Sequence, residues 1–103
     1  MIKMYARVIK AVFGPDSAWE VQHIVNVLAA KSKQMNGFID VVLLADYENG
    51  EYESISWWET RDDAFLSYKA IADQLKEMVG DNIQWEPTVQ IFEVYRPKSI
   101  DMV

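Results

Sequence analysis

Arg7 is the residue with the clearest chemical potential, because it stands in the middle of an apolar run that covers residues 3–13. It shares alternate positions of that run with Tyr5 and Ile9. A charge in such surroundings is costly unless it is paired or solvated. Two interpretations follow. The guanidinium holds an anionic oxygen of a bound molecule, or it forms an ion pair with an acid on a neighbouring strand, such as Glu93. The ion pair is the commoner arrangement for a buried charge.

Two other side chains are candidates for chemistry. Tyr68 falls on the apolar side of a predicted helix, where its hydroxyl could hydrogen-bond a ligand or act as a weak acid, although such tyrosines more often belong to the core. His23 is the only histidine and lies with Trp19 on the outer side of another predicted helix. No nucleophile and no metal-ligand spacing accompanies His23, so we interpret it as a solvated surface residue. The sequence predicts no metal site, no catalytic triad and no phosphate-binding loop.

Length and composition fit one domain, residues 1–103. Half of the residues are hydrophobic, and they include four Trp, five Tyr and four Phe. Some of this aromatic surface is expected to be covered by a partner or a ligand. The net charge of −6, with the acids scattered, argues against binding to nucleic acid or to an anionic membrane. We see no signal peptide and no membrane-spanning segment, so we expect a cytoplasmic protein.

Four segments have the character of β-strands. They are rich in β-branched and aromatic residues and are bounded by glycine, proline or Asn-Gly pairs. Asn49-Gly50 predicts a hairpin between the second and the third segment. The predicted strands are residues 3–13, Phe38–Asp46, Glu51–Trp58 and residues 88–95.

Two segments show the 3.6-residue periodicity of amphipathic helices. The first begins at a Ser-x-x-Glu capping box at Ser17, and we expect it to end at Asn36-Gly37. The second begins at a Thr-x-x-Asp motif at Thr60, and we expect it to end at Gly80.

The order βαββαβ predicts an α+β fold of the ferredoxin-like type. In this fold two crossovers place both helices on one face of a four-stranded antiparallel sheet. The other face would be bare, yet the strands carry apolar residues on both alternations. The same face of a second copy is the simplest cover, so we expect a homodimer.

The segment Ser-Trp-Trp-Glu-Thr-Arg-Asp-Asp-Ala-Phe, residues 56–65, carries a family resemblance together with the element order and the Gly14-Pro15 turn. A strand that ends in Trp, a polar cap, and Ala plus an aromatic residue opening the second helix are typical of the antibiotic-biosynthesis-monooxygenase-like domain. The chain resembles this domain of the dimeric α+β barrel superfamily over roughly residues 3–97. The resemblance implies a homodimer whose two sheets form a barrel, and a ligand cavity between sheet and helices in each subunit.

The resemblance also implies roles for particular residues. In the family register Arg7 lies in the cavity, where it would hold the anion of an electron-rich ring, and Tyr68 would position that ring. These two are the predicted catalytic residues. Trp57 and Trp58 are adjacent in a strand and therefore point to opposite faces, one near the cavity and one at the dimer interface. Together with Phe65 they are the predicted substrate-binding residues.

Heme degradation is not expected. Heme-degrading members of the superfamily use an Asn, a Trp and a His at positions that correspond to Arg7, Tyr68 and Glu77, and none of the three is retained. The predicted function is a small-molecule-binding homodimer that uses no cofactor and acts as a monooxygenase on an aromatic or quinol-type substrate. The alternative is a non-catalytic ligand-sensing or interaction dimer on the same fold, which the lack of an obvious general base favours.

Overall fold

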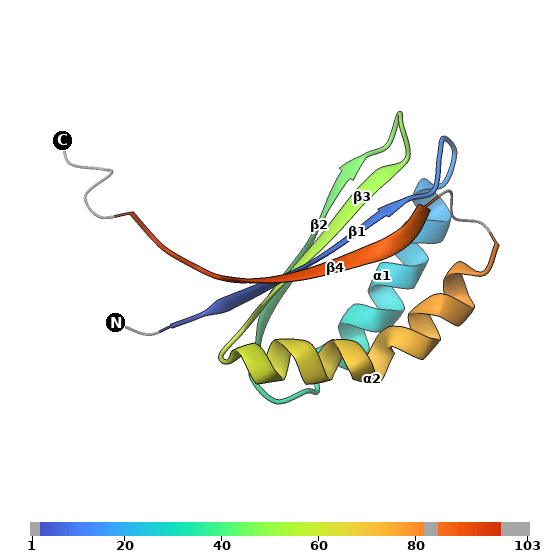
Figure 1. Cartoon of the computed structure of the whole chain (residues 1–103). Coiled ribbons are helices and arrows are strands. Elements are labelled where there is room, and N and C mark those ends of the chain that lie inside the picture. The colour runs from blue at the N-terminus through green and yellow to red at the C-terminus, as the bar shows by residue number, and fades with distance from the viewer. Residues whose placement is uncertain (1–2, 82–84, 98–103) are drawn as a thin grey trace.

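The computed structural model describes residues 3–81 and 85–97. Its elements follow the predicted order, with strands and helices as drawn in Figure 1. They are β1 (Tyr5–Val12), α1 (Ala18–Ser32), β2 (Phe38–Asp46), β3 (Glu51–Trp58), α2 (Arg61–Val79) and β4 (Trp85–Glu93).

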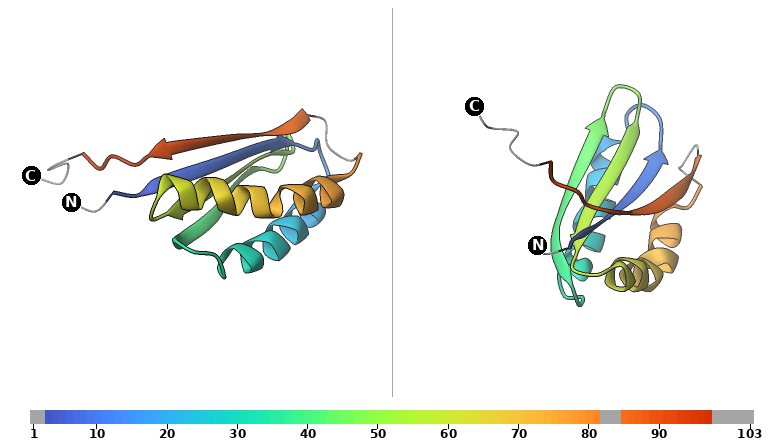
Figure 2. Two further views of the ribbon diagram at one scale, coloured as in Figure 1. Left: turned by 60° about the horizontal axis from the view of Figure 1, so that its bottom comes forward. Right: turned by 60° about the vertical axis from the view of Figure 1, so that its left-hand side comes forward.

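The four strands form one antiparallel sheet in the order β2-β3-β1-β4. Each helix connects two strands that are not neighbours in the sheet, and both helices lie on the same side of it, as the two views of Figure 2 show. This arrangement confirms the predicted α+β, ferredoxin-like fold. It leaves the other side of the sheet without a covering element.

The strand register decides which residues face the helices. Arg7 lies opposite Ser56 of β3 and Ile91 of β4, and Tyr5 lies opposite Trp58. Because directly paired residues point to the same face of a sheet, these side chains share the face that the helices cover. Arg7 and Trp58 are buried, in agreement with that assignment.

The core lies between this sheet face and the two helices. The largest fully buried side chain is Trp58, and the rings of Phe13 and Tyr52 pack edge to face with centroids 5.9 Å apart. Burying one large apolar side chain contributes about 1.5–3 kcal/mol. The buried apolar residues along one side of each helix therefore hold the helices on the sheet. The aliphatic ones are Val21, Ile24 and Leu28 of α1 and Ile71, Leu75 and Val79 of α2.

The uncovered face of the sheet carries exposed apolar side chains beside polar ones such as Lys10 and Glu53. Val42, Leu44 and Phe92 are 39%, 51% and 45% exposed, and Trp57 is half-buried. Their register places them on the side opposite Arg7. Val42 pairs with Ile55 and Ile55 with Val8, so one apolar row crosses three strands of this face. An exposed apolar area on a protein surface often marks an interaction site.

The start and the end of α1 differ from the prediction. Ser17 stands at the N-cap, but its hydroxyl makes no capping bond; it donates to the Gly14 carbonyl (2.6 Å) and contacts the Tyr52 hydroxyl (2.9 Å). The helix ends at Ser32, four residues before the predicted Asn36, and the Ser32 hydroxyl donates to the Leu28 carbonyl. At the start of α1 the contact of Ser17 with Tyr52 replaces the predicted capping box. At its end the bond from Ser32 to the Leu28 carbonyl takes the place of the predicted stop at Asn36-Gly37.

The boundaries of α2 agree with the prediction. The Thr60 hydroxyl accepts a hydrogen bond from the Asp63 backbone N–H (2.9 Å), and Gly80 follows the helix with φ of 56°. By contrast β4 begins before Pro87, which lies inside the strand. Proline is tolerated there because β4 is an edge strand. The polar turn predicted before Pro87 lies partly outside the described residues, and the tail predicted after residue 97 lies outside them.

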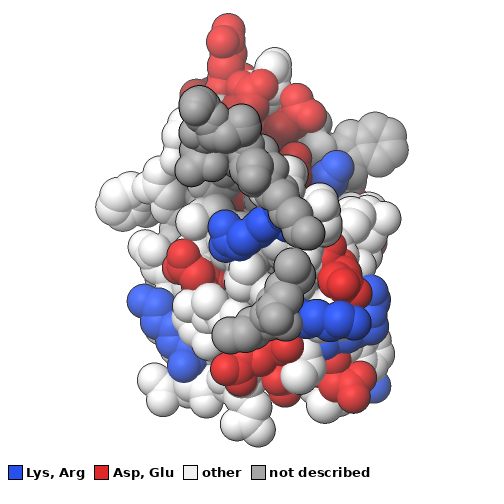
Figure 3. Space-filling model, turned by 90° about the vertical axis from the view of Figure 1, so that its left-hand side faces the viewer, with Lys and Arg blue, Asp and Glu red and all other residues white. Residues whose placement is uncertain are grey.

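One end of the molecule shows how its charged side chains are distributed. Basic and acidic side chains are interspersed on the end of the molecule that Figure 3 shows. Among the described residues, no helix combines the length and the apolar character needed to cross a bilayer.

Candidate functional site

A cavity of about 70 Å³ lies between the sheet and the two helices. Its wall is largely apolar and is built from all four strands and both helices. Five lining residues carry polar side-chain atoms: Arg7, Ser32, Tyr52, Ser54 and Ser56. An engineered cavity of about 150 Å³ binds benzene, so this space alone holds only a fragment of a small molecule.

Arg7 is the only charged residue in this wall and is 3% exposed. Its Nη1 donates to the Ser67 Oγ (2.6 Å) and to the Ala64 carbonyl (3.2 Å), both on the first turns of α2. Its guanidinium carbon lies 5.1 Å from the centroid of the Trp58 ring and 5.9 Å from that of Tyr68. Such distances allow cation–π attraction, which is stronger in desolvated surroundings.

The charge of Arg7 is not balanced by a carboxylate in the described part of the chain. Both hydrogen-bonding partners are neutral, and the buried Nε–H has no partner among residues 3–81 and 85–97. Glu93 is exposed and lies opposite Tyr5, two positions from Ile91, which is the residue opposite Arg7. The alternative ion pair with Glu93 does not form; the Arg7 guanidinium bonds to α2 instead. Burial lowers the pKa of Arg7 to about 10, partly offset by Tyr68. Arg7 is therefore a cation at neutral pH that has no counter-ion among the described residues.

Ser56 stands next to Arg7 on the cavity wall, directly opposite it in the strand pair. The Trp58 Nε1–H donates to the Ser56 Oγ at 2.8 Å. Sequence reasoning missed both Ser56 and Ser67. A signal was present in β3, where Ser54 and Ser56 occupy the same alternation as Trp58; small side chains at core-facing strand positions leave space instead of filling it.

Tyr52 provides a polar group at the other end of β3. Its hydroxyl contacts the Ser17 Oγ at 2.9 Å, and that hydroxyl donates in turn to the Gly14 carbonyl. Ser56 lies four positions after Tyr52 in β3, which corresponds to roughly 13 Å along an extended strand. The cavity therefore has apolar middle walls with a phenol toward one end and a guanidinium toward the other.

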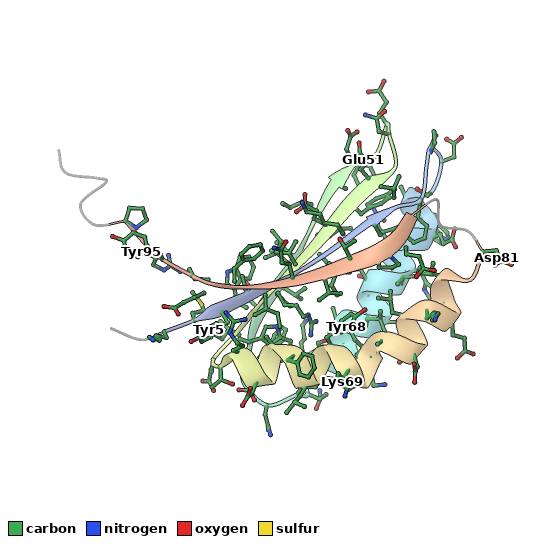
Figure 4. All side chains as sticks on the ribbon, viewed as in Figure 1. Tyr5, Glu51, Tyr68, Lys69, Asp81 and Tyr95 are labelled. Atoms are coloured by element: carbon green, nitrogen blue, oxygen red, sulfur yellow. The ribbon has the colours of Figure 1, made fainter. Side chains whose placement is uncertain are left out.

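Tyr68 lies in a groove beside the cavity and does not line the cavity itself. The groove has a volume of about 440 Å³ and runs between α2 and the start of β4. It shares three wall residues with the cavity: Leu75, Val79 and Pro87. Tyr68 is half-buried and leaves α2 in a different direction from the exposed Lys69, as Figure 4 shows. Since its ring also approaches Arg7, Tyr68 lies at the boundary between the two spaces.

The remaining predicted residues lie outside the cavity wall. Trp58 is fully buried beside Arg7, and Trp57 points to the uncovered sheet face, so the two tryptophans do lie on opposite faces as predicted. Phe65 is 50% exposed and packs near the Lys69 ammonium, 5.6 Å from its ring centroid. The substrate-binding roles of Trp57, Trp58 and Phe65 remain predictions.

Histidine and carboxylate side chains contribute nothing to the cavity wall. His23 is exposed on α1. Within the described ranges, no group of three or more possible metal ligands comes together. The ionisable side chains of the wall are those of Arg7 and Tyr52.

The chain matches no protein-family model and none of the curated proteins. It is similar to solved structures. One is named "Putative antibiotic biosynthesis monooxygenase from Nitrosomonas europaea", with 17% identity, a TM-score of 0.76, and coverage of 91% of this chain and 92% of that one. A protein of the same printed description from Caulobacter crescentus CB15 has 19% identity, a TM-score of 0.73, and coverage of 90% and 91%. SnoaB, a cofactor-independent oxygenase from Streptomyces nogalater, has 15% identity, a TM-score of 0.63, and coverage of 97% and 98%.

These likenesses define the class. The chain is an α+β protein of ferredoxin-like topology with a cavity between sheet and helices. More particularly, it has the fold of the antibiotic-biosynthesis-monooxygenase-like domain over nine-tenths or more of its length. The resemblance noted in the sequence is thus confirmed at the level of the fold.

Proposed function

We propose that the protein is a small-molecule-binding homodimer that acts as a cofactor-independent monooxygenase on an aromatic, quinol-type substrate. One observation carries the proposal: a buried, unbalanced Arg7 stands in the wall of an apolar cavity. A buried cation is unfavourable without an anionic partner. A substrate that becomes a phenolate supplies that partner, and the cation then stabilises the charge that reacts with dioxygen.

In this reaction a quinol loses a proton to become an electron-rich anion, which reacts with dioxygen at a ring carbon. One oxygen atom becomes a hydroxyl group on that carbon, and the other leaves as water with two hydrogens of the substrate. The substrate gives up four electrons, two as the quinol becomes a quinone and two at the new C–O bond. Arg7 holds the oxyanion, and the apolar wall keeps water from the reacting carbon.

The ligand has to extend from the cavity into the groove. The enclosed volume of about 70 Å³ is too small for one aromatic ring, but the neighbouring groove adds about 440 Å³. Tyr68 lies where the two spaces meet and is positioned to contact the ring of such a ligand. Leu75, Val79 and Pro87 form the shared wall, so their movement would join the two spaces.

The uncovered sheet face supports the homodimer. It presents Val42, Leu44 and Phe92 to solvent, and a second copy would cover the same residues on both partners. We expect Leu44→Asp to shift the protein to the monomer, measured as a fall in mass by sedimentation. Trp19→Asp, at an apolar position on α1 that is 88% exposed, is the matched control and should leave the mass unchanged. A monomeric wild-type protein would refute the dimer.

The similarity to SnoaB agrees with this chemistry, because that protein is a cofactor-independent oxygenase with the same fold. The second candidate function is a non-catalytic ligand sensor on the same dimer. It is favoured by the composition of the cavity wall, which contains no carboxylate or histidine that could accept a proton. A base would have to come from the groove, where Asp73, Asp81 and Glu86 lie.

The initial rate of dioxygen uptake with naphthohydroquinone distinguishes the two functions. An oxygenase should accelerate uptake above the spontaneous rate, and Arg7→Met should remove the acceleration. Arg61→Met removes an exposed arginine from the start of α2 and should leave the rate unchanged. Saturable binding of naphthohydroquinone without faster uptake would favour the sensor, and equal uptake by wild type and Arg7→Met would refute the role of Arg7.

A further inference from the structure

Ser56 offers a second hydrogen-bond donor beside Arg7. Its Oγ accepts the Trp58 Nε1–H at 2.8 Å, which uses one lone pair and leaves the hydroxyl proton available. In the described part of the chain, the Ser56 hydroxyl donates to no acceptor. Ser56 is 2% exposed, so bulk water does not provide one either.

Arg7 has a matching free donor. Its Nη1 is committed to Ser67 and Ala64 on α2, whereas the buried Nε–H has no partner among the described residues. Ser56 and Arg7 face each other across the β1–β3 pair, and both line the cavity. Side chains directly opposite each other in antiparallel strands have Cβ atoms about 5 Å apart. The two side chains that carry the free donors therefore lie side by side on the cavity wall.

We propose that Ser56 and Arg7 together form a receptor for one oxyanion, and that Trp58 positions the Ser56 hydroxyl for it. The ligand is then an anion with an apolar body, such as an aromatic carboxylate or a phenolate. Two unfilled buried donors on adjacent strands favour a negatively charged oxygen, since hydrogen bonds to ions are stronger than those to neutral groups. The inference rests on the proposed use of the cavity as a ligand site, but it holds whether or not the ligand is oxidised.

Benzoate and benzamide test the proposal, because they share shape and size and differ in charge. Their affinities are measured by NMR titration of the Trp indole N–H signals, with the Trp58 signal assigned by its loss in Trp58→Phe. We expect benzoate to bind at least about ten-fold more tightly than benzamide to the wild type, as a charge-assisted hydrogen bond provides. The Trp58 signal should shift on binding, because its acceptor, Ser56, gains a new partner.

Ser56→Ala should reduce the preference for benzoate by about five-fold or more, with a smaller loss for benzamide. This variant also removes the acceptor of the buried Trp58 N–H and could unfold. Ser56→Cys is the second variant, because it keeps the volume and a weak acceptor while its thiol is a poor donor. It should lower the same ratio. Thr88→Ala, which removes an exposed hydroxyl from β4 outside the cavity wall, is the matched control and should leave the ratio unchanged.

Two results would overturn the inference. Equal affinity of the wild type for benzoate and benzamide would show that the cavity does not select an anion. An unchanged ratio in both Ser56 variants would show that Ser56 does not donate to it. A failure of the proposed oxygenase activity is distinguishable from these results. In that case the protein would not accelerate dioxygen uptake with naphthohydroquinone, while the preference for benzoate would persist.

Discussion

Replacing Arg7 by methionine should make the ligand-free protein more stable, although it removes the central residue of the site. Burial lowers the pKa of Arg7 from the ordinary value of arginine to about 10, and each pKa unit corresponds to about 1.4 kcal/mol. Holding the charge in the folded protein therefore costs roughly 3 kcal/mol at neutral pH. The penalty is complete below the folded-state pKa of about 10 and disappears as the pH rises toward the higher pKa of the unfolded chain.

Methionine removes this penalty but also removes the hydrogen bonds to Ser67 and Ala64. Each such bond contributes about 1 kcal/mol, so the net effect is a stabilisation of about 1 kcal/mol. Methionine is unbranched and flexible, so its side chain can fill the space beside the Trp58 and Tyr68 rings that Arg7 occupies. Functional groups in other proteins show the same conflict between stability and activity.

The assay is urea or thermal unfolding of wild type and Arg7→Met at equal protein concentration, because association would change the apparent stability. For a domain of this size, 1 kcal/mol corresponds to a rise in melting temperature of about 4–8 °C. Arg61→Met is the control and should change the free energy of unfolding by less than about 0.5 kcal/mol. A loss of about 3 kcal/mol or more in Arg7→Met would refute the reasoning, because it would show that the fold compensates the charge and that Arg7 has a structural role.

Two further predictions concern the loop between β2 and β3. Gly50→Ala should destabilise the protein by more than about 2 kcal/mol in urea unfolding, since φ is +68° and a Cβ would collide with the Gly14 carbonyl group. Gly80→Ala has similar dihedral strain but its nearest atom is 3.9 Å away, so a loss of only about 1 kcal/mol is expected; equal losses would refute the collision. Hydrogen bonds from the Asn49 side chain and backbone hold the pKa of Asp46 below its usual value. The stability they provide is present above the unfolded-state pKa and is lost as the pH falls through the lower folded-state pKa, so Asn49→Ala should raise the pKa of Asp46 in an NMR titration.

The sequence was sufficient for the fold because its local signals agree with one another. The bounds of β2 and β3 match the predicted segments, and the alternation in β1 correctly places Arg7 with Tyr5 and Ile9. Alternation with a period of two is a property of the strand itself, so it survives without knowledge of the tertiary structure.

The parts that the sequence did not predict depend on partners distant along the chain. The Ser17 hydroxyl makes no capping hydrogen bond and instead contacts the Tyr52 hydroxyl, 35 residues away. Arg7 bonds to Ser67, 60 residues away, instead of to an acid on the next strand. The Trp58 indole N–H donates to the Ser56 Oγ, and the periodicity of the sequence does not predict this bond. Candidate residues could therefore be named from the sequence, but the donors left free in the cavity could be found only in the structure.

The fate of the oxygen atoms in the product tests the central claim most directly. Naphthohydroquinone is incubated with the protein under isotopically heavy dioxygen, and the product is analysed by mass spectrometry. The account predicts a hydroxynaphthoquinone that carries one heavy oxygen atom and forms faster with wild type than with Arg7→Met. A product without heavy oxygen, or one formed equally fast with wild type, with Arg7→Met and without protein, would contradict it.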